Sequence, residues 1–307
     1  MAKKREEETQ PAVGGAHDGA PLRDLLRLPV GEPVDLSAHD AGATPGAPGD
    51  KAAGLAATAR TGKDLAGLQE RLWAGATAGD RRRILLVLQG MDTSGKGGTV
   101  KHVIGVCDPA GCRIHAFKAP TPEEQRHDFL WRVVKALPRP GEIGIFDRSH
   151  YEDVLIAKVR SLAPYDEIES RYDRINGFET SLTDDGVTII KCFLHISYEE
   201  QRRRLLKRLD TPRKRWKFAP GDLDERALWP AYQRAYETAL TRCTTLAAPW
   251  YLVPADHKWY RNWAVSRLLL EHLRELDPQY PAAEFDVDEY RELLAQGAVR
   301  PRSRPGG

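Results

Sequence analysis

The sequence predicts an α/β fold in which a five-stranded parallel sheet is covered by helices on both faces. Short apolar runs alternate with amphipathic segments along the chain, which is typical of strands joined by crossover helices. The runs are continuously apolar, as expected of strands buried on both faces. The first run leads into a glycine-rich loop with one lysine, GMDTSGKGG (residues 90–98), and then into an amphipathic segment. This succession of strand, glycine loop and helix predicts a phosphate-binding P-loop.

Composition and charge narrow the class of protein. The chain has 307 residues, of which 41% are hydrophobic, so a substantial core can form. Its formal net charge is only +2, so the overall charge does not by itself predict that the protein binds a polyanion. No apolar run reaches the about 18 residues that a membrane-spanning helix needs, and the start, MAKKREEETQ, lacks the apolar core of a signal peptide. With four scattered cysteines, we expect a cytoplasmic protein without membrane association.

The N-terminal part is expected to contribute no strand. Residues 1–20 are charged and then rich in Ala and Gly, which predicts disorder. Residues 21–80 are expected to form an arm rich in Pro, Gly and Asp, followed by a helix with an apolar stripe from residue 65 to residue 73. The short apolar piece 22–30 could pack onto the main domain.

The main domain is expected to span residues 81–278. Apolar runs predict its five strands at 84–88, 112–117, 143–146, 187–196 and 250–253. Helical spacing or position between strands predicts helices at 100–107, 127–137, 197–211, 222–246 and 259–276. Pro230 should break the fourth of these helices. The stretch 201–246 is expected to form a helical lid, and residues 279–307 a polar tail.

The glycine-rich loop has the spacing of a phosphate-binding P-loop, with Gly90, Gly95 and Lys96 at the GxxxxGK positions. The loop glycines, which include Gly97 and Gly98, let backbone N–H groups turn toward one point, where Lys96 adds a full positive charge. Gly97 stands where a Ser or Thr normally binds Mg²⁺. We therefore expect Asp92 to be the Mg²⁺ ligand in the loop, with Thr99 as a weaker candidate.

A second acidic position follows the third predicted strand. Asp147 ends this strand, so it should face the phosphates and Mg²⁺ at the carboxyl edge of the sheet. Arg148, the next residue, can bind a phosphate through two parallel hydrogen bonds. His150 and Glu152 lie one turn further along, and each is either a nucleotide-side residue or an ordinary helix-start residue.

A strongly basic stretch covers residues 201–217, QRRRLLKRLDTPRKRWK, with nine basic residues and one acid. Such an excess indicates an anionic partner, although a charge run is often only a solvated face. Three interpretations remain open here: lid arginines on transferred phosphates, a channel for a longer polyanion, or a nucleic-acid patch.

Six segments together resemble the polyphosphate kinase 2 family of polyphosphate:nucleotide phosphotransferases. They are GMDTSGKGG, FKAPT (117–121), HDFLWR (127–132), FDRSHYEDVL (146–155), RLDTPRKRWKF (208–218) and PADHKWYRN (254–262). The resemblance spans roughly residues 22–278 and implies a P-loop kinase fold with a helical lid. It implies Mg²⁺-dependent phosphoryl transfer between inorganic polyphosphate and an adenine nucleotide, with guanine nucleotides left open. It also implies a homo-oligomer, and no nucleic-acid partner.

By motif position, the resemblance implies roles for individual residues. Asp92 and Asp147 match the family's paired catalytic carboxylates, Lys96 its P-loop lysine and Arg148 its phosphate clamp. The residues that match its polyphosphate and lid positions are Arg204, Arg208, Lys214, Lys217, Lys118 and Arg132. SHYED (149–153) resembles the subgroup that accepts both AMP and ADP, but Asp147 and the GKGG form of the loop depart from that subgroup. The choice between AMP and ADP therefore stays open.

Two other functions remain as alternatives to polyphosphate-dependent nucleotide phosphorylation. One is a nucleoside monophosphate kinase that uses ATP as donor. The other is a non-catalytic polyanion-binding protein, which would have no need of the paired carboxylates Asp92 and Asp147.

Overall fold

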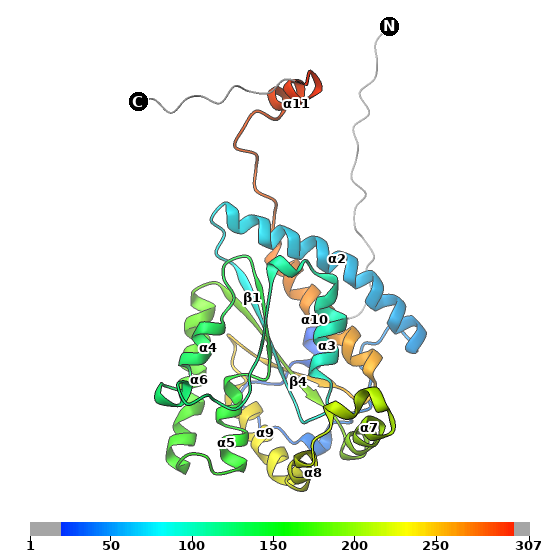
Figure 1. The fold of residues 1–307 in the computed structure, drawn as a ribbon, viewed down its shortest axis with the longest axis vertical. Helices are drawn as coiled ribbons and strands as arrows, with labels where there is room; N and C mark the ends of the chain where they lie inside the picture. Colours follow the sequence, from blue (N-terminus) through cyan, green and yellow to red (C-terminus); the bar gives the residue numbers. More distant parts are fainter. Residues whose placement is uncertain (1–19, 298–307) are drawn as a thin grey trace.

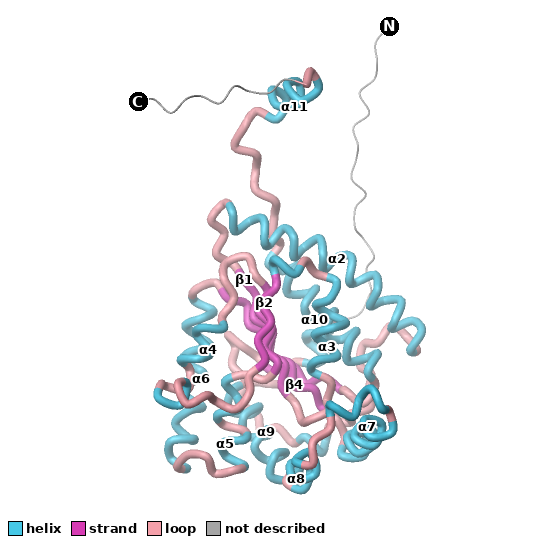
Figure 2. Tube along the Cα trace, viewed as in Figure 1, coloured by secondary structure: helices cyan, strands magenta, loops and turns pink. Residues whose placement is uncertain are grey.

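The computed structural model describes residues 20–297, and its centre is a five-stranded sheet between two helical layers (Figure 1 and Figure 2). The strand order is β2-β3-β1-β4-β5, and each neighbouring pair is parallel. The strands are β1 (Arg83–Gln89), β2 (Cys112–Ala116), β3 (Ile143–Asp147), β4 (Val187–His195) and β5 (Trp250–Pro254). The five predicted strands and the fold class are confirmed. Nearly all of the segment predicted to be disordered, 1–20, lies outside the described residues.

The central strand β1 explains why the strand runs are continuously apolar. Leu85 and Val87 pack into the core on one face of the sheet, whereas Ile84, Leu86 and Leu88 pack into the core on the other. Because side chains alternate across a strand, a strand covered on both faces needs apolar residues at every position.

Helices from distant parts of the chain form the two layers. The first layer comprises α2 (Lys51–Thr77), α3 (Lys96–Val103) and α10 (Lys258–Leu276). The second comprises α4 (Trp131–Ala136), α5 (Ile156–Val159), α6 (Tyr165–Asp184) and α9 (Trp229–Cys243). Both layers leave free the carboxyl ends of the strands, where the P-loop and the turn after β3 meet.

Three helices differ in extent from the prediction. The helix α2 begins at Lys51, where the Asp50 carboxylate accepts from the Ala53 N–H at 2.9 Å. The helix α3 ends at Val103 and continues only as a 3-10 turn to Val106. The helix predicted over 127–137 begins at Trp131, because the Asp128 carboxylate instead caps a turn by accepting from the Leu130 N–H.

The N-terminal arm contains a short helix, α1 (Leu22–Leu26), and packs on the body as expected. Leu22 and Leu26 are buried, and the Leu28 N–H donates to the Trp250 carbonyl at 2.9 Å. This contact covers the open edge of β5, which would otherwise expose unpaired backbone groups.

The segment predicted as a lid begins with α7 (Tyr198–Asp210), which Ser197 caps and which ends before Pro212. A 3-10 segment (Pro212–Lys217) and α8 (Gly221–Ala227) follow, and the expected break lies between α8 and α9, next to Pro230. Beyond α10, the helix α11 (Val287–Ala295) stands apart from the body (Figure 1). Within residues 20–297, no helix is long and apolar enough to cross a membrane.

Candidate active site

A cavity of about 720 Å³ opens at the carboxyl end of the sheet. Two carboxylates line it, Asp92 and Asp147. Its positively charged lining residues are Lys96, Lys101, Lys118, Arg148, Arg204, Arg208, Lys214, Lys217, Lys258 and Arg261. Ten cations against two carboxylates make this cavity suited to a ligand with many negative charges.

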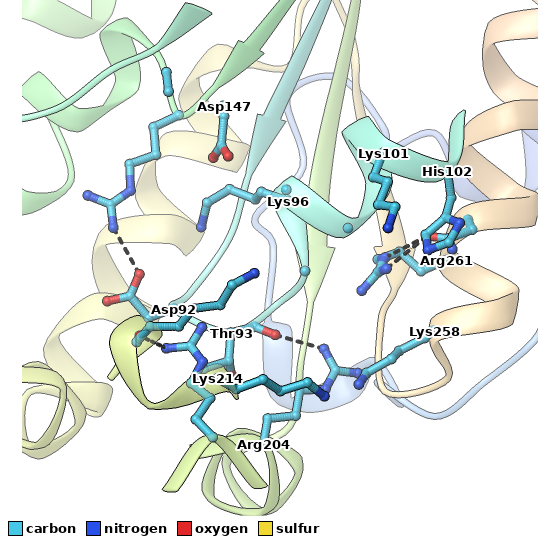
Figure 3. A pocket seen from close by; sticks show the side chains of 18 of the residues that line it. Asp92, Thr93, Lys96, Lys101, His102, Asp147, Arg204, Lys214, Lys258 and Arg261 are labelled. Carbon is cyan, nitrogen blue, oxygen red and sulfur yellow. Dashed lines mark hydrogen bonds and ion pairs between the residues drawn. The ribbon is translucent and has the colours of Figure 1, made fainter. Parts of the chain in front are cut away.

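The P-loop forms the floor of the cavity. Gly90 and Gly95 have φ angles of +148° and +112°, which side chains with a Cβ rarely adopt. The buried Lys96 ammonium folds back along the loop and donates to the Gly90 carbonyl at 2.8 Å. Figure 3 shows Lys96 between Asp92 and Asp147. Burial and the charge of Arg148 lower the pKa of Lys96, while the two aspartates oppose this shift.

Asp92 and Arg148 form an ion pair beside the P-loop. An Arg148 guanidinium N–H donates to the Asp92 carboxylate at 2.9 Å, and Glu152 lies 3.8 Å from the other guanidinium nitrogen. Burial would raise the pKa of Asp92, but the charges of Lys96 and Arg148 outweigh it and hold this pKa below its usual value. Asp92 is therefore ionised at neutral pH. Thr99, the weaker candidate, is buried and hydrogen bonds to the Gly95 carbonyl, outside the cavity lining.

A second, smaller cavity of about 140 Å³ adjoins the first. Asp92 and Arg148 line both cavities and so stand between them. The smaller cavity is otherwise lined by Gly90, Met91, Glu152, Ile156, Gln201, Glu225, Tyr232 and Tyr236. Burial raises the pKa of Glu152, against the opposing charge of Arg148. The smaller cavity thus combines aromatic and apolar groups with three carboxylates and a single cation, whereas the larger one is mainly cationic.

The residues of the basic stretch differ in what their charges contact. Arg208, Lys214 and Lys217 line the cavity, and Arg208 also donates to the Lys217 carbonyl at 2.9 Å and forms an ion pair with Asp222 at 3.5 Å. Arg204 lines it too, but it is only 6% exposed and all five of its N–H donors are occupied. They bind the Glu200 carboxylate and carbonyls of the P-loop and of residues 255–256. Arg204 therefore holds the P-loop in place.

Two predicted site residues do not reach either cavity. Arg132 is buried, donates to the Lys118 carbonyl at 2.9 Å and forms an ion pair with Asp153 at 3.3 Å. It supports Lys118, which does line the larger cavity. His150 is 1% exposed and lies 3.2 Å from the Glu179 carboxylate inside the core. Of the two alternatives left open for His150, this position agrees with the helix-start residue, because His150 begins the 3-10 turn His150–Asp153 and lines neither cavity.

Several cavity residues escaped the sequence reasoning. Lys258 and Arg261 come from the start of α10, and Lys101 and His102 from α3 (Figure 3). Arg261 is buried beneath the P-loop, where a Cβ on Gly95 would lie 1.7 Å from its Nη1 atom. Arg261 donates to the Ser94 carbonyl at 3.0 Å and to the Asn262 side-chain oxygen at 2.8 Å. The motif PADHKWYRN, which contains Lys258 and Arg261, was the signal that could have identified them.

Comparisons with known proteins agree with this geometry. Residues 49–281 match the family model described as polyphosphate kinase 2. The chain is 48% identical over 253 residues to the AMP/ADP-polyphosphate phosphotransferase of Meiothermus ruber, covering 82% of this chain and 90% of that protein. It is 41% identical over 229 residues to the ADP-polyphosphate phosphotransferase of Rhodopseudomonas palustris, covering 71% and 78%. A crystal structure of polyphosphate kinase 2 from Arthrobacter aurescens superposes with a TM-score of 0.88 at 48% identity, covering 92% of this chain and 100% of that one.

Proposed function

This chain belongs to the polyphosphate kinase 2 family, and we propose that it transfers a phosphoryl group between inorganic polyphosphate and an adenine nucleotide. The observation that carries the proposal is the pair of adjoining cavities that share Asp92 and Arg148. The cationic cavity suits a polyphosphate chain, which carries one charge on each phosphate unit. The smaller cavity, with Tyr232 and Tyr236, suits the nucleotide acceptor.

The transfer itself requires positioning and charge neutralisation rather than a protein nucleophile. A phosphate oxygen of the nucleotide attacks the terminal phosphorus of polyphosphate in line. The bond from that phosphorus to the next unit of the chain breaks, so the polyphosphate shortens by one unit and the nucleotide gains one. Lys96 and Arg148 lie where the transferred group would pass, and their charges stabilise its oxygens. One phosphoanhydride bond breaks and another forms, so the transfer can run in either direction.

Mg²⁺ is part of the proposal. Within residues 20–297, no three His, Cys, Asp or Glu side chains gather as a metal site. The two carboxylates Asp92 and Asp147 nonetheless fit Mg²⁺, which is commonly held by one or two carboxylates together with substrate phosphates. When bound there, the ion would neutralise phosphate charge. Asp92 would then take the place of the loop hydroxyl that Gly97 lacks.

One assay matrix tests the function. AMP, ADP, GMP and GDP are each incubated with short or long polyphosphate and Mg²⁺, without ATP, and product nucleotides are separated. Phosphorylation of AMP, ADP or both, with loss of polyphosphate, is expected. The Meiothermus ruber relative is named for both acceptors and the Rhodopseudomonas palustris relative for ADP, so both acceptors belong in the matrix. A requirement for ATP as donor would overturn the proposal in favour of a monophosphate kinase, and binding without turnover would indicate a polyanion-binding protein.

The cations of the larger cavity should set the affinity for polyphosphate. Alanine in place of Arg208 or Lys258 is expected to raise the KM for polyphosphate about tenfold, because each substitution removes a charge-assisted contact. The KM for the nucleotide should change less. Lys214 and Lys217, further along the basic stretch, should matter more for long chains than for short ones. In wild type, higher salt should raise the KM for polyphosphate, by analogy with other polyanions.

The matched control is Arg213→Ala, which removes a charge from the same basic stretch at an exposed position outside the cavity lining. This variant should keep its polyphosphate KM. Equal effects of Arg213→Ala and Arg208→Ala would mean that the stretch acts only through its overall charge.

Lys258 also predicts a pH dependence. Burial, together with the nearby charges of Arg204, Lys207 and Arg261, lowers the pKa of Lys258 to about 8. The free enzyme therefore loses this positive charge as the pH rises above 8, and kcat/KM for polyphosphate should fall there. The Lys258→Ala variant should lack that part of the decline. An identical pH profile in the variant would show that Lys258 does not contact the donor.

A further inference from the structure

Four buried polar side chains form a cluster next to the turn that carries Asp147, Arg148 and Glu152. They are His150 and Tyr151 in the turn, Glu179 on α6 and Lys191 on β4, and each is at most 1% exposed. We call them the buried polar cluster. It lies within the apolar core that β4 shares with α6 and α9, and none of its members lines a cavity. Burial of a carboxylate and an ammonium away from water costs free energy, so the presence of this ion pair in the core calls for a physical explanation.

The carboxylate, the ammonium and the hydroxyl of the cluster all have hydrogen-bond partners, and the His150 Nε2 atom lies 3.2 Å from the Glu179 carboxylate, whereas the buried His150 Nδ1 atom has no partner within residues 20–297. Lys191 donates to the Glu179 carboxylate at 2.6 Å, to the Cys243 carbonyl at 2.7 Å and to the Tyr151 hydroxyl at 2.8 Å, which occupies all three ammonium protons. The Tyr151 hydroxyl in turn donates to Glu179 at 2.8 Å. Burial would raise the pKa of Glu179, but Lys191 and His150 outweigh it and keep this carboxylate ionised.

Stability alone is a weak reason for such a cluster, because a buried ion pair commonly contributes no more than well-packed apolar residues would. The backbone of the turn supplies another reason. Arg148 has a φ angle of +64°, in the left-handed region, which is unfavourable for a residue with a Cβ. Such a conformation persists only where surrounding contacts hold it. His150 and Tyr151, which follow within three residues, are the turn residues that Glu179 and Lys191 bind.

We propose that the buried polar cluster is a positioning device that holds the 147–152 turn so that Asp147, Arg148 and Glu152 face the two cavities. His150, Tyr151, Glu179 and Lys191 are then positioning residues, and His150 acts through the turn rather than on the nucleotide. This inference rests on the proposed phosphoryl transfer, because its main readout is the rate of that reaction. A loosened turn would slow transfer more than it would weaken binding, since alignment of the reacting atoms is the more demanding requirement.

The first test compares two conservative variants, Tyr151→Phe and Tyr251→Phe. Each removes one hydroxyl from a buried tyrosine, but the Tyr251 hydroxyl contacts His272 in the other helical layer, at 3.1 Å. Tyr151→Phe is expected to lower kcat about tenfold with both KM values nearly unchanged, whereas Tyr251→Phe should keep the wild-type kcat. Unchanged kcat in Tyr151→Phe, an effect confined to one KM, or an equal loss in Tyr251→Phe would overturn the proposal.

A second test removes both charges together, in the double variant Lys191→Met, Glu179→Gln. It avoids leaving one charge buried alone, which could prevent folding. At a temperature where the double variant is folded, kcat should stay at least about tenfold below wild type. A wild-type kcat would overturn the positioning role, and if this variant does not fold, the tyrosine pair decides.

A readout that is independent of activity separates this inference from the proposed function. Hydrogen exchange at the amides of residues 148–152, measured by mass spectrometry, should be faster in Tyr151→Phe than in wild type and unchanged in Tyr251→Phe. If the wild-type protein does not use polyphosphate, the proposed function is overturned. The exchange rates of the two tyrosine variants then decide the positioning role without any activity measurement. Active wild type with equal exchange and equal kcat in Tyr151→Phe would overturn the positioning role alone.

Discussion

Replacement of Lys96 by alanine is expected to lower kcat about 100- to 1000-fold, while the protein stays folded. The Lys96 ammonium lies between Asp92 and Asp147 and contacts the P-loop carbonyl of Gly90. When the transferred phosphoryl group passes this point, Lys96 is the buried cation best placed to balance its charge. Its loss leaves the developing negative charge without that partner, and the effect should appear in kcat more than in either KM.

The measurement is steady-state kinetics with polyphosphate and ADP, alongside circular dichroism to verify folding. Lys63→Ala is the matched control, because it removes an exposed lysine from α2, outside both cavities. It should leave the kinetics unchanged. A folded Lys96→Ala protein that retains most of its rate would contradict the phosphate-binding role of the loop.

Asparagine in place of Asp147 or Asp92 is expected to lower kcat by at least about 100-fold and to raise the Mg²⁺ concentration needed for half-maximal rate. Asparagine keeps the shape of the side chain but removes its charge. The substitution therefore weakens the binding of a cation without creating a cavity. The Asp92 variant also releases Arg148 from its 2.9 Å ion pair. Its kinetics should therefore show an added rise in KM for the nucleotide.

Magnesium titrations at saturating substrate test this prediction directly. The control is Asp184→Asn, at an exposed position at the end of α6, far from the P-loop in sequence. Its Mg²⁺ curve should match that of wild type. If both active-site variants kept the wild-type Mg²⁺ curve, the two carboxylates would have a role other than holding the ion.

The elements of the sheet and the P-loop could be predicted from the sequence because their signals are local. A strand that is buried on both faces needs apolar residues at successive positions, and the run from Ile84 to Leu88 meets this need. Gly90 and Gly95 occupy backbone conformations that favour glycine, so their spacing carries information without any knowledge of distant contacts. Asp147 was predictable for a similar reason, since a residue at the end of a parallel strand lies at the carboxyl edge of the sheet.

The contacts that each basic side chain makes in the folded protein could not be predicted in the same way. Arg204 and Lys214 belong to one basic stretch and both line the cavity, yet the N–H donors of Arg204 are occupied by Glu200 and by backbone carbonyls. Sequence shows only that a side chain is charged. Whether the charge meets a carbonyl, a carboxylate or a ligand depends on which elements the fold brings beside it.

By itself, therefore, the sequence determined the order of strands and helices, the phosphate-binding loop and the family to which the chain belongs. Only the tertiary structure decided that His150 and Arg132 are buried outside both cavities and that Lys258 and Arg261 line the larger one. The physical reason is distance along the chain. The strand and glycine signals arise from neighbouring residues, whereas Arg261 meets Ser94 across 167 positions, and such a meeting exists only after the sheet and its helices have packed.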